Sequence, residues 1–187
     1  NTLAGNYTIS KTEGTLTITV SDALTVKVTG FTGLYNGVTH YVSSVPSDTN
    51  GTTLYYSTTG GTNLASYTTT PIGVKNVSES KTIYVAAVNP NYETAFGYAE
   101  ITLSKRTVVL TSATDNKVYD GTPLTNAGVT PSGDGFVDDE GFESTPAASG
   151  TITDVGSTSN TLVIPALKDN TLAGNYTISK TEGTLTI

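Results

Sequence analysis

Residues 1–18 read NTLAGNYTISKTEGTLTI, and residues 170–187 read the same eighteen letters without one substitution. The sequence therefore returns to its own beginning, with Asn1 recurring as Asn170 and Ile18 as Ile187. An unbroken repeat of this length indicates recent duplication, and it predicts a tandem array of near-identical units. The first partners that we expect for this chain are therefore neighbouring copies of the same repeat.

A second, more diverged repeat lies inside the first. Tyr35-Asn36-Gly37 is followed by Tyr119-Asp120-Gly121, and the same spacing along the chain separates Asn91-Tyr92 from Asn175-Tyr176. Each unit therefore divides into two halves of similar length, which we predict to be two domains. The predicted bounds are 21–105 for the first domain and 106–187 for the second, with 1–20 as the closing strands of a preceding unit.

Threonine alternates with aliphatic residues in several short stretches. In 14–20, Leu16, Ile18 and Val20 fall on one face and the threonines on the other, which is the pattern of a half-buried strand. Similar patterns predict strands at 24–28, 82–86, 99–103, 107–111 and 161–164. The best helical candidate, 136–142, is about two turns long and contains a glycine. We therefore expect a mainly β fold with at most one short helix.

The predicted joints between domains, near 21–22 and 104–106, lack the Gly/Ser-rich or Pro-rich stretches of a flexible spacer. This predicts two small β domains, β-grasp-like or Ig-like sandwiches, joined end to end as an elongated rod.

The composition excludes several classes of function. The chain has 38 threonines but no cysteine and a single histidine, so disulfides, Cys-ligated metals and thiol nucleophiles are excluded. The net charge of −7 argues against nucleic acid as a partner. No apolar run approaches the ~20 residues of a membrane span, so we expect no membrane insertion. We expect no cofactor and no enzymatic activity.

The second half carries KVYDGTPLTN at 117–126, GDGFVDDEG at 133–141 and NYTISKTEGTLTI at 175–187. It resembles the YDG/MBG ("mostly beta grasp") repeats of large bacterial surface proteins. The first half, with GLYNGVTHYV at 33–42 and YVAAVNPNYETA at 84–95, is similar to the usual neighbour of such repeats. The resemblance implies an extracellular stalk or spacer repeat in a cell-wall-anchored adhesin of a Gram-positive bacterium, which projects a distal binding region.

The two repeated motifs have structural interpretations. Tyr35, Asn36 and Gly37, like Tyr119, Asp120 and Gly121, predict a tight hairpin with positive φ at its tip and a tyrosine packed beside it. In Asn91-Tyr92 and Asn175-Tyr176, the Asn side chain can bond neighbouring backbone while the Tyr closes the edge of the core.

Two surfaces could bind ligands. Asp134, Asp138, Asp139, Glu140 and Glu143 offer oxygens for calcium, although their spacing is not that of an EF-hand and a solvated acidic turn is the alternative. The first domain holds eight of the eleven tyrosines, and exposed tyrosines suit recognition of a host glycan or protein. This suggests a weak binding module acting through avidity, with tyrosine packing in a thin core as the alternative. The tyrosines of this candidate ligand surface are Tyr41, Tyr55, Tyr56 and Tyr67.

Two other kinds of chemistry have little support. His40 is near Ser43 and Ser44 in sequence, but nothing marks an oriented base or an oxyanion hole. An intramolecular isopeptide bond would pair Lys27 with Asn91 or Lys117 with Asn175, but neither lysine recurs at the equivalent position of the other half.

Overall fold

The computed structural model describes residues 6–8 and 10–187, and it is mainly β, as expected. The strands of the first half are β1 (Val26–Thr29), β2 (Phe31–Leu34), β3 (Ser43–Pro46), β4 (Thr53–Ser57), β5 (Lys81–Val88) and β6 (Ala95–Ser104). Those of the second half are β7 (Arg106–Ser112), β8 (Asp115–Asn116), β9 (Leu124–Thr125), β10 (Val129–Gly133), β11 (Ala147–Ala148), β12 (Thr151–Ile152), β13 (Ser157–Asn160), β14 (Leu162–Val163), β15 (Tyr176–Thr181) and β16 (Gly183–Thr186).

Three 3₁₀ turns of three residues have both bounds among the described residues: η2 (Leu64–Ser66), η3 (Val77–Glu79) and η4 (Ala173–Asn175). The helix considered for 136–142 is wrong, because this segment is a loop with a turn at Asp138 and Asp139. Asp139 has a φ of 67°, which an α-helix cannot contain. None of the helices among the described residues is long and apolar enough to cross a membrane.

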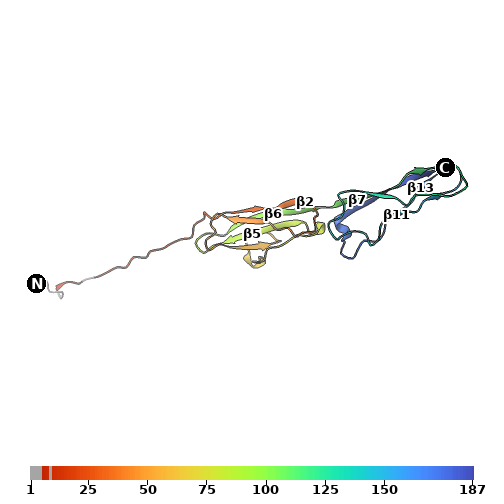
Figure 1. Ribbon diagram of the computed structural model, residues 1–187. Coiled ribbons are helices and arrows are strands. Elements are labelled where there is room, and N and C mark those ends of the chain that lie inside the picture. Colours follow the sequence, from red (N-terminus) through yellow and green to blue (C-terminus); the bar gives the residue numbers. More distant parts are fainter. Residues whose placement is uncertain (1–5, 9) are drawn as a thin grey trace.

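The strands form two groups that share no sheet. The N-terminal sheet group contains a four-stranded sheet, ordered β2-β6-β5-β4, and the pair β1-β3. The C-terminal sheet group contains the sheets β10-β7-β15 and β13-β16-β8 and the pairs β12-β9 and β11-β14. Figure 1 shows the second group following the first along the chain.

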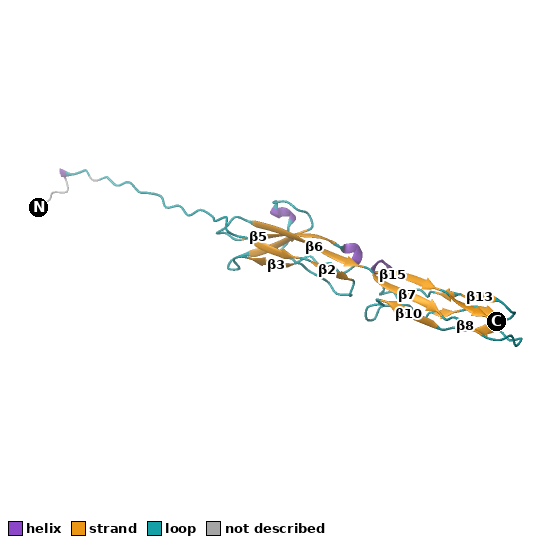
Figure 2. Cartoon of the chain, turned by 90° about the horizontal axis from the view of Figure 1, so that it is seen from above, coloured by secondary structure: helices purple, strands orange, loops and turns teal. Residues whose placement is uncertain are grey.

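Both groups pair an early strand with their last long strand or strands in parallel. In the C-terminal group β7 pairs with β15 and β8 with β16, and partners in both pairs have the same spacing along the chain, as in Thr107↔Thr177 and Asp115↔Leu185. In the N-terminal group β2 pairs with β6 at this spacing too, as in Phe31↔Ile101. Figure 2 shows β7 and β15 side by side. The two halves therefore share a backbone plan as well as sequence motifs.

The duplicated sequence has different structures at the two ends. In the second copy it forms β15 and β16, and Leu185 is fully buried. In the first copy, residues 10–20 form no strand, and Leu16 and Ile18 are fully exposed. The expected strand at 14–20 is therefore wrong. The sequence is the same but the sheet partners are absent, and a strand without them is not stable in water.

Two apolar clusters form the core. The first cluster lies within the N-terminal group, around Val74, Ile83, Val85 and Ile101, which are fully buried. The second consists of Val108, Leu110, Leu162 and Tyr176 together with Tyr35. Tyr35 follows β2, so a residue of the first half completes the core of the second.

Candidate functional site

The boundary between the two sheet groups is a short and well-bonded joint. Only Lys105 separates the end of β6 from the start of β7. Tyr35 and Tyr176 pack edge to face across the boundary, with ring centroids 5.7 Å apart and an interplanar angle of 84°. Both rings are almost completely buried. We call Tyr35, Glu140 and Tyr176 the joint triad.

Glu140 connects the two tyrosines. Its carboxylate accepts a hydrogen bond from the Tyr35 hydroxyl at 2.5 Å and another from the Tyr176 hydroxyl at 2.7 Å. The Tyr176 hydroxyl also accepts from the backbone N–H of Val137 at 3.2 Å. Hydrogen bonds to an ionised acceptor are stronger than neutral ones, so this carboxylate holds residues of both groups.

Burial and the neighbouring carboxylate both favour the neutral tyrosines. Burial, reinforced by the hydrogen bond to Glu140 and its charge, raises the pKa of Tyr35 to about 12. Burial also raises the pKa of Tyr176 strongly, with Glu140 adding to the effect and the Val137 N–H opposing it. The triad therefore keeps its hydroxyl donors across the neutral range.

Two further residues cross the joint. Asn175 is fully buried; its Oδ1 accepts from the Val77 N–H at 3.0 Å, and its Nδ2 donates to Asn76 Oδ1 at 2.9 Å. Arg106 donates through Nη1 to the Tyr35 carbonyl at 3.4 Å and through Nε to the Gly135 carbonyl at 2.8 Å. The joint is therefore held by side chains as well as by the chain itself.

The Tyr-Asn/Asp-Gly motifs lie at turns but not at hairpin tips. Gly37 and Gly121 both have a φ of 78°. The strands that flank each motif are not paired with each other, so the expected hairpins are wrong. Asp120 instead accepts from Lys117 Nζ at 2.7 Å and from the Thr122 N–H at 2.9 Å, which closes a local turn and lowers the pKa of Asp120.

The tyrosines of the two motifs differ in burial. Tyr35 is 2% exposed, because the second half covers it, whereas Tyr119 is 56% exposed. The tyrosine packed beside the turn, which we expected for both motifs, is therefore present only at Tyr35. Asn36 Oδ1 accepts from the Val38 N–H at 3.2 Å and lies 3.0 Å from His40 Nε2.

The two Asn-Tyr motifs occupy equivalent places, because each tyrosine pairs with a residue at the beginning of its own half. Tyr176 is paired in parallel with Arg106, the first residue of β7, and Tyr92 is paired in parallel with Ser21. The Tyr92 hydroxyl donates to Asp48 Oδ2 at 3.0 Å, as Tyr176 does to Glu140. Asn175 is buried in the joint, but Asn91 is exposed.

The acidic side chains that we considered for calcium do not gather at one place. Asp134 Oδ2 accepts from the N–H and hydroxyl of Thr107 at 2.8 and 2.7 Å, and Glu140 is committed to the two tyrosines. Asp138, Asp139 and Glu143 make no shared site with them. In the described part of the chain, no three carboxylate or histidine side chains come close enough to hold a metal ion. The members of the acidic cluster therefore have separate structural surroundings.

The predicted tyrosine surface is only partly brought together. Tyr41 is 54% exposed, Tyr55 is half-buried and Tyr56 is buried in the first core cluster. Tyr67 instead lies 6.2 Å from the ring of Phe96, and Tyr84 lies 5.8 Å from that of Tyr98. These last four rings line a cavity of 300 Å³ beside Gly61 and Gly97, and we call them the aromatic face. The sequence pattern missed Tyr84, Phe96 and Tyr98.

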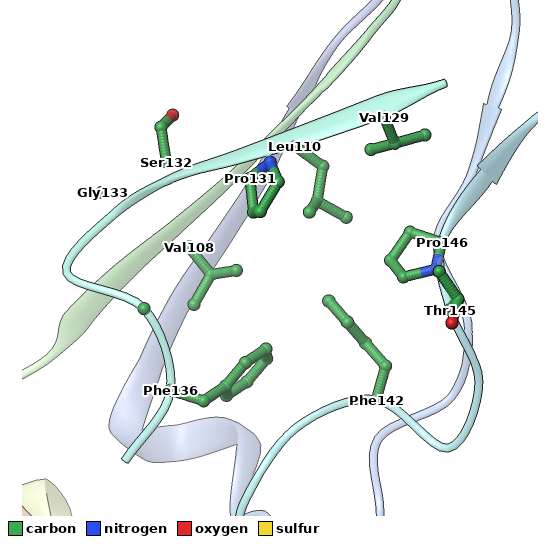
Figure 3. Close-up of a pocket in the computed structure, with 11 residues that line it drawn as sticks. Val108, Leu110, Val129, Pro131, Ser132, Gly133, Phe136, Phe142, Thr145 and Pro146 are labelled. Atoms are coloured by element: carbon green, nitrogen blue, oxygen red, sulfur yellow. The ribbon is translucent and has the colours of Figure 1, made fainter. Parts of the chain in front are cut away.

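A larger apolar cavity of 490 Å³ lies in the C-terminal group (Figure 3). Val108 and Leu110 of β7 form one wall, and Phe136 and Phe142 of the loop after β10 face them. Phe136 packs edge to face with Phe142 at 5.0 Å, and its ring lies 4.8 Å from that of Tyr176. The cavity is thus a loosely filled continuation of the second core cluster.

The remaining candidates are His40 and the two lysine–asparagine pairs considered for an isopeptide bond. His40 stacks on Phe31 with ring centroids 3.7 Å apart and contacts Asn36. Lys117 is bonded in the turn with Asp120 and Thr122, and its N–H donates to Thr186 near the chain end, whereas Asn175 is buried in the joint. An isopeptide bond between Lys117 and Asn175 is therefore excluded. No hydrogen bond joins Lys27 and Asn91, both of which lie among the described residues.

In comparison with known proteins, this chain matches no protein-family model, and no curated protein sequence matches it.

Proposed function

We propose that this chain is a stalk or spacer repeat of a cell-surface adhesin. In this proposal residues 21–105 and 106–187 are two sandwich-like β domains, joined end to end as a stiff rod. Tandem copies project a distal binding region away from the cell wall. The chain has no catalytic role in this proposal, and it acts outside the cell.

The observation that carries this proposal is the place of Tyr35. A residue of the first half is buried in the core of the second and bonded there to Glu140, and a single residue connects the two halves. A flexible linker would leave the ends of both halves in water. This joint instead couples the orientation of one half to the other, which is what a spacer of fixed length requires.

The unbroken repeat gives further support. An array whose units share one sequence can gain or lose copies without changing any contact, so its length can vary while its structure stays the same.

Small-angle X-ray scattering tests the proposal. We would compare the chain of 187 residues with a two-copy chain, in which residues 19–187 follow directly after Ile187. The maximum dimension should rise nearly in proportion to the number of copies. Tyr35→Ala in both copies is the control, because it loosens the joint and should broaden the distance distribution. A two-copy chain that folds back to a compact particle would contradict the stalk.

A second candidate function is weak binding of a host glycan or protein, multiplied by the array. The aromatic face favours it, because Tyr98 is 70% exposed and Phe96 is 41% exposed beside the 300 Å³ cavity. Exposed rings stack well on the apolar faces of sugars. Binding of a two-copy chain to a glycan array should fall with Tyr98→Ala but not with Val163→Ala, an exposed residue of the other half. Equal binding by both variants would reject this candidate.

A further inference from the structure

The repeat and the joint together point to a second interface, at the two outer ends of the chain. Within the chain, Tyr35 lies at the end of the N-terminal group that adjoins the C-terminal group, and there it packs on Tyr176 of the C-terminal group. Their counterparts in the other halves, Tyr119 and Tyr92, lie at the opposite ends and do not meet a second tyrosine within the described residues. Tyr119 is 56% exposed, whereas Tyr35 is 2% exposed.

The backbone register around Tyr119 matches that around Tyr35. Phe31 and Thr32 pair with Ile101 and Thr102, and the corresponding Asp115 and Asn116 pair with Leu185 and Thr186. All four pairs are parallel. β2 then continues until the Tyr35 N–H donates to the Ser104 carbonyl at 2.9 Å. The place that corresponds to Ser104 is one residue beyond Ile187.

The duplicated sequence says which residue follows there in an array. Ile187 corresponds to Ile18, so the next residue is Thr19 of the next copy. Extending the pairing of β8 and β16 by two residues beyond Asn116↔Thr186 places the Thr19 carbonyl where it accepts from the Tyr119 N–H. Gly156 already holds the end of β16 in position, because it exchanges two backbone hydrogen bonds with Ile187, at 3.0 and 2.9 Å.

The spacing on the far side of the joint also matches. Within the chain, Arg106 comes two residues after Ser104, and it pairs with Tyr176. In the array, Ser21 comes two residues after Thr19, and it pairs in parallel with Tyr92. Tyr119 and the Tyr92 of the next copy are therefore separated by the same two-residue offset in strand register as Tyr35 and Tyr176.

A carboxylate is already in place for this second joint. Asp48 Oδ2 accepts from the Tyr92 hydroxyl at 3.0 Å, as Glu140 accepts from Tyr176. The turn glycines agree with this arrangement. A Cβ on Gly37 would lie 3.4 Å from Val137 across the existing joint, while a Cβ on Gly121 would have no neighbour within 4 Å.

We propose that the exposed tip around Tyr119 is a docking surface for the next copy of this chain, where Tyr119 packs on Tyr92 and bonds Asp48. This inference rests on the proposed function, since it requires tandem copies. It makes the array continuous, with equivalent tyrosine joints within and between units. The second joint lacks the arginine bridge, because Ser21 occupies the position in the first half that Arg106 occupies in the second. It should therefore be the weaker of the two.

The two-copy chain tests this with a control built into it. Tyr119 of the first copy lies at the proposed joint, and Tyr119 of the second copy lies at the free end. Tyr119→Ala in the first copy should lower the melting temperature of the two-copy chain by at least about 2 °C relative to the same substitution in the second copy. In the single-copy chain this substitution should leave melting unchanged, which shows that it does not disturb folding.

A second variant checks the partner. Asp48→Asn in the second copy should remove part of the effect of Tyr119→Phe in the first copy, because both changes break the same hydrogen bond. Equal melting of the two Tyr119→Ala variants would overturn the inference. Scattering on the same chain keeps the two proposals apart. If the two-copy chain is elongated but the two Tyr119→Ala variants melt at the same temperature, the stalk proposal stands and the second joint is rejected. If the two-copy chain is compact, the stalk proposal itself is rejected.

Discussion

Glu140→Ala is the substitution that tests the joint triad most directly. It removes the acceptor shared by the Tyr35 and Tyr176 hydroxyls, and both tyrosines are at most 3% exposed. A buried polar group left without a partner costs about 1–3 kcal/mol. The Val137 N–H still reaches the Tyr176 hydroxyl, and water can enter the space that Glu140 leaves.

We therefore expect the free energy of unfolding to fall by about 2–3 kcal/mol, rather than by the full sum for two hydroxyls. For a chain of this length, such a loss lowers the melting temperature by about 5–10 °C. Circular dichroism or scanning calorimetry measures it directly. Glu143→Ala is the matched control, because Glu143 is a carboxylate that follows Glu140 closely in the same loop but lies outside the triad.

Combined variants test whether the three side chains act as a unit. Once Tyr35→Phe and Tyr176→Phe have removed the hydroxyls, Glu140→Ala should cost much less than it does alone, because its two donors are gone. Melting of Glu140→Ala within about 1 °C of the parent chain would refute the reasoning, since a shift that small corresponds to well under 1 kcal/mol. Strictly additive effects of the three substitutions would also refute it.

Three further predictions use other observations. The pKa of Tyr35 in the folded chain, about 12, is above its unfolded value of ~10. The stabilisation that this shift represents is therefore complete below pH 10 and is lost as the pH rises toward 12. Urea titrations at pH 8 and above should show the free energy of unfolding decline. Tyr35→Phe should make this decline smaller. Gly121→Val should cost about 1–2 kcal/mol through backbone strain at positive φ, and Gly37→Val should cost more, since its side chain also meets Val137; equal or unchanged melting of the two variants would contradict this. Removal of residues 1–18 should leave the melting temperature unchanged, because 10–18 are exposed and form no strand, and a drop of several degrees would contradict the structure at this end.

Alternation along the sequence was sufficient to predict most of the long strands. The segments 82–86, 99–103 and 107–111 lie inside β5, β6 and β7, where apolar residues face a core on at least one side. It failed at 14–20, which has the same pattern. A periodic pattern identifies a segment that can pair, but the pairing depends on a partner that the local sequence does not contain.

The joint could be predicted only in outline. The short link at 104–106 and the paired motifs indicated that two halves meet, but no spacing rule connects Tyr35 to Glu140, which is 105 residues further along the chain. The same limit explains the calcium candidate, because carboxylates close in sequence had separate partners in space. The aromatic face could have been predicted more nearly from the sequence. Tyr98 and Phe96 share one face of β6, and Tyr84 lies opposite Tyr98 in β5.

The parallel pairing of first and last segments has a consequence for a chain pulled from its two ends. Tension enters the C-terminal group at Arg106 and leaves at Ile187, so it runs along β7 and β15 in the direction of the strands. The six residue pairs from Tyr176↔Arg106 to Thr181↔Thr111 are then loaded in shear and share the force, whereas pulling across the strands would open them one at a time. Resistance to such pulling depends on the rate of forced unfolding rather than on equilibrium stability. We therefore expect the resistance of the C-terminal group to tension to depend on these six pairs.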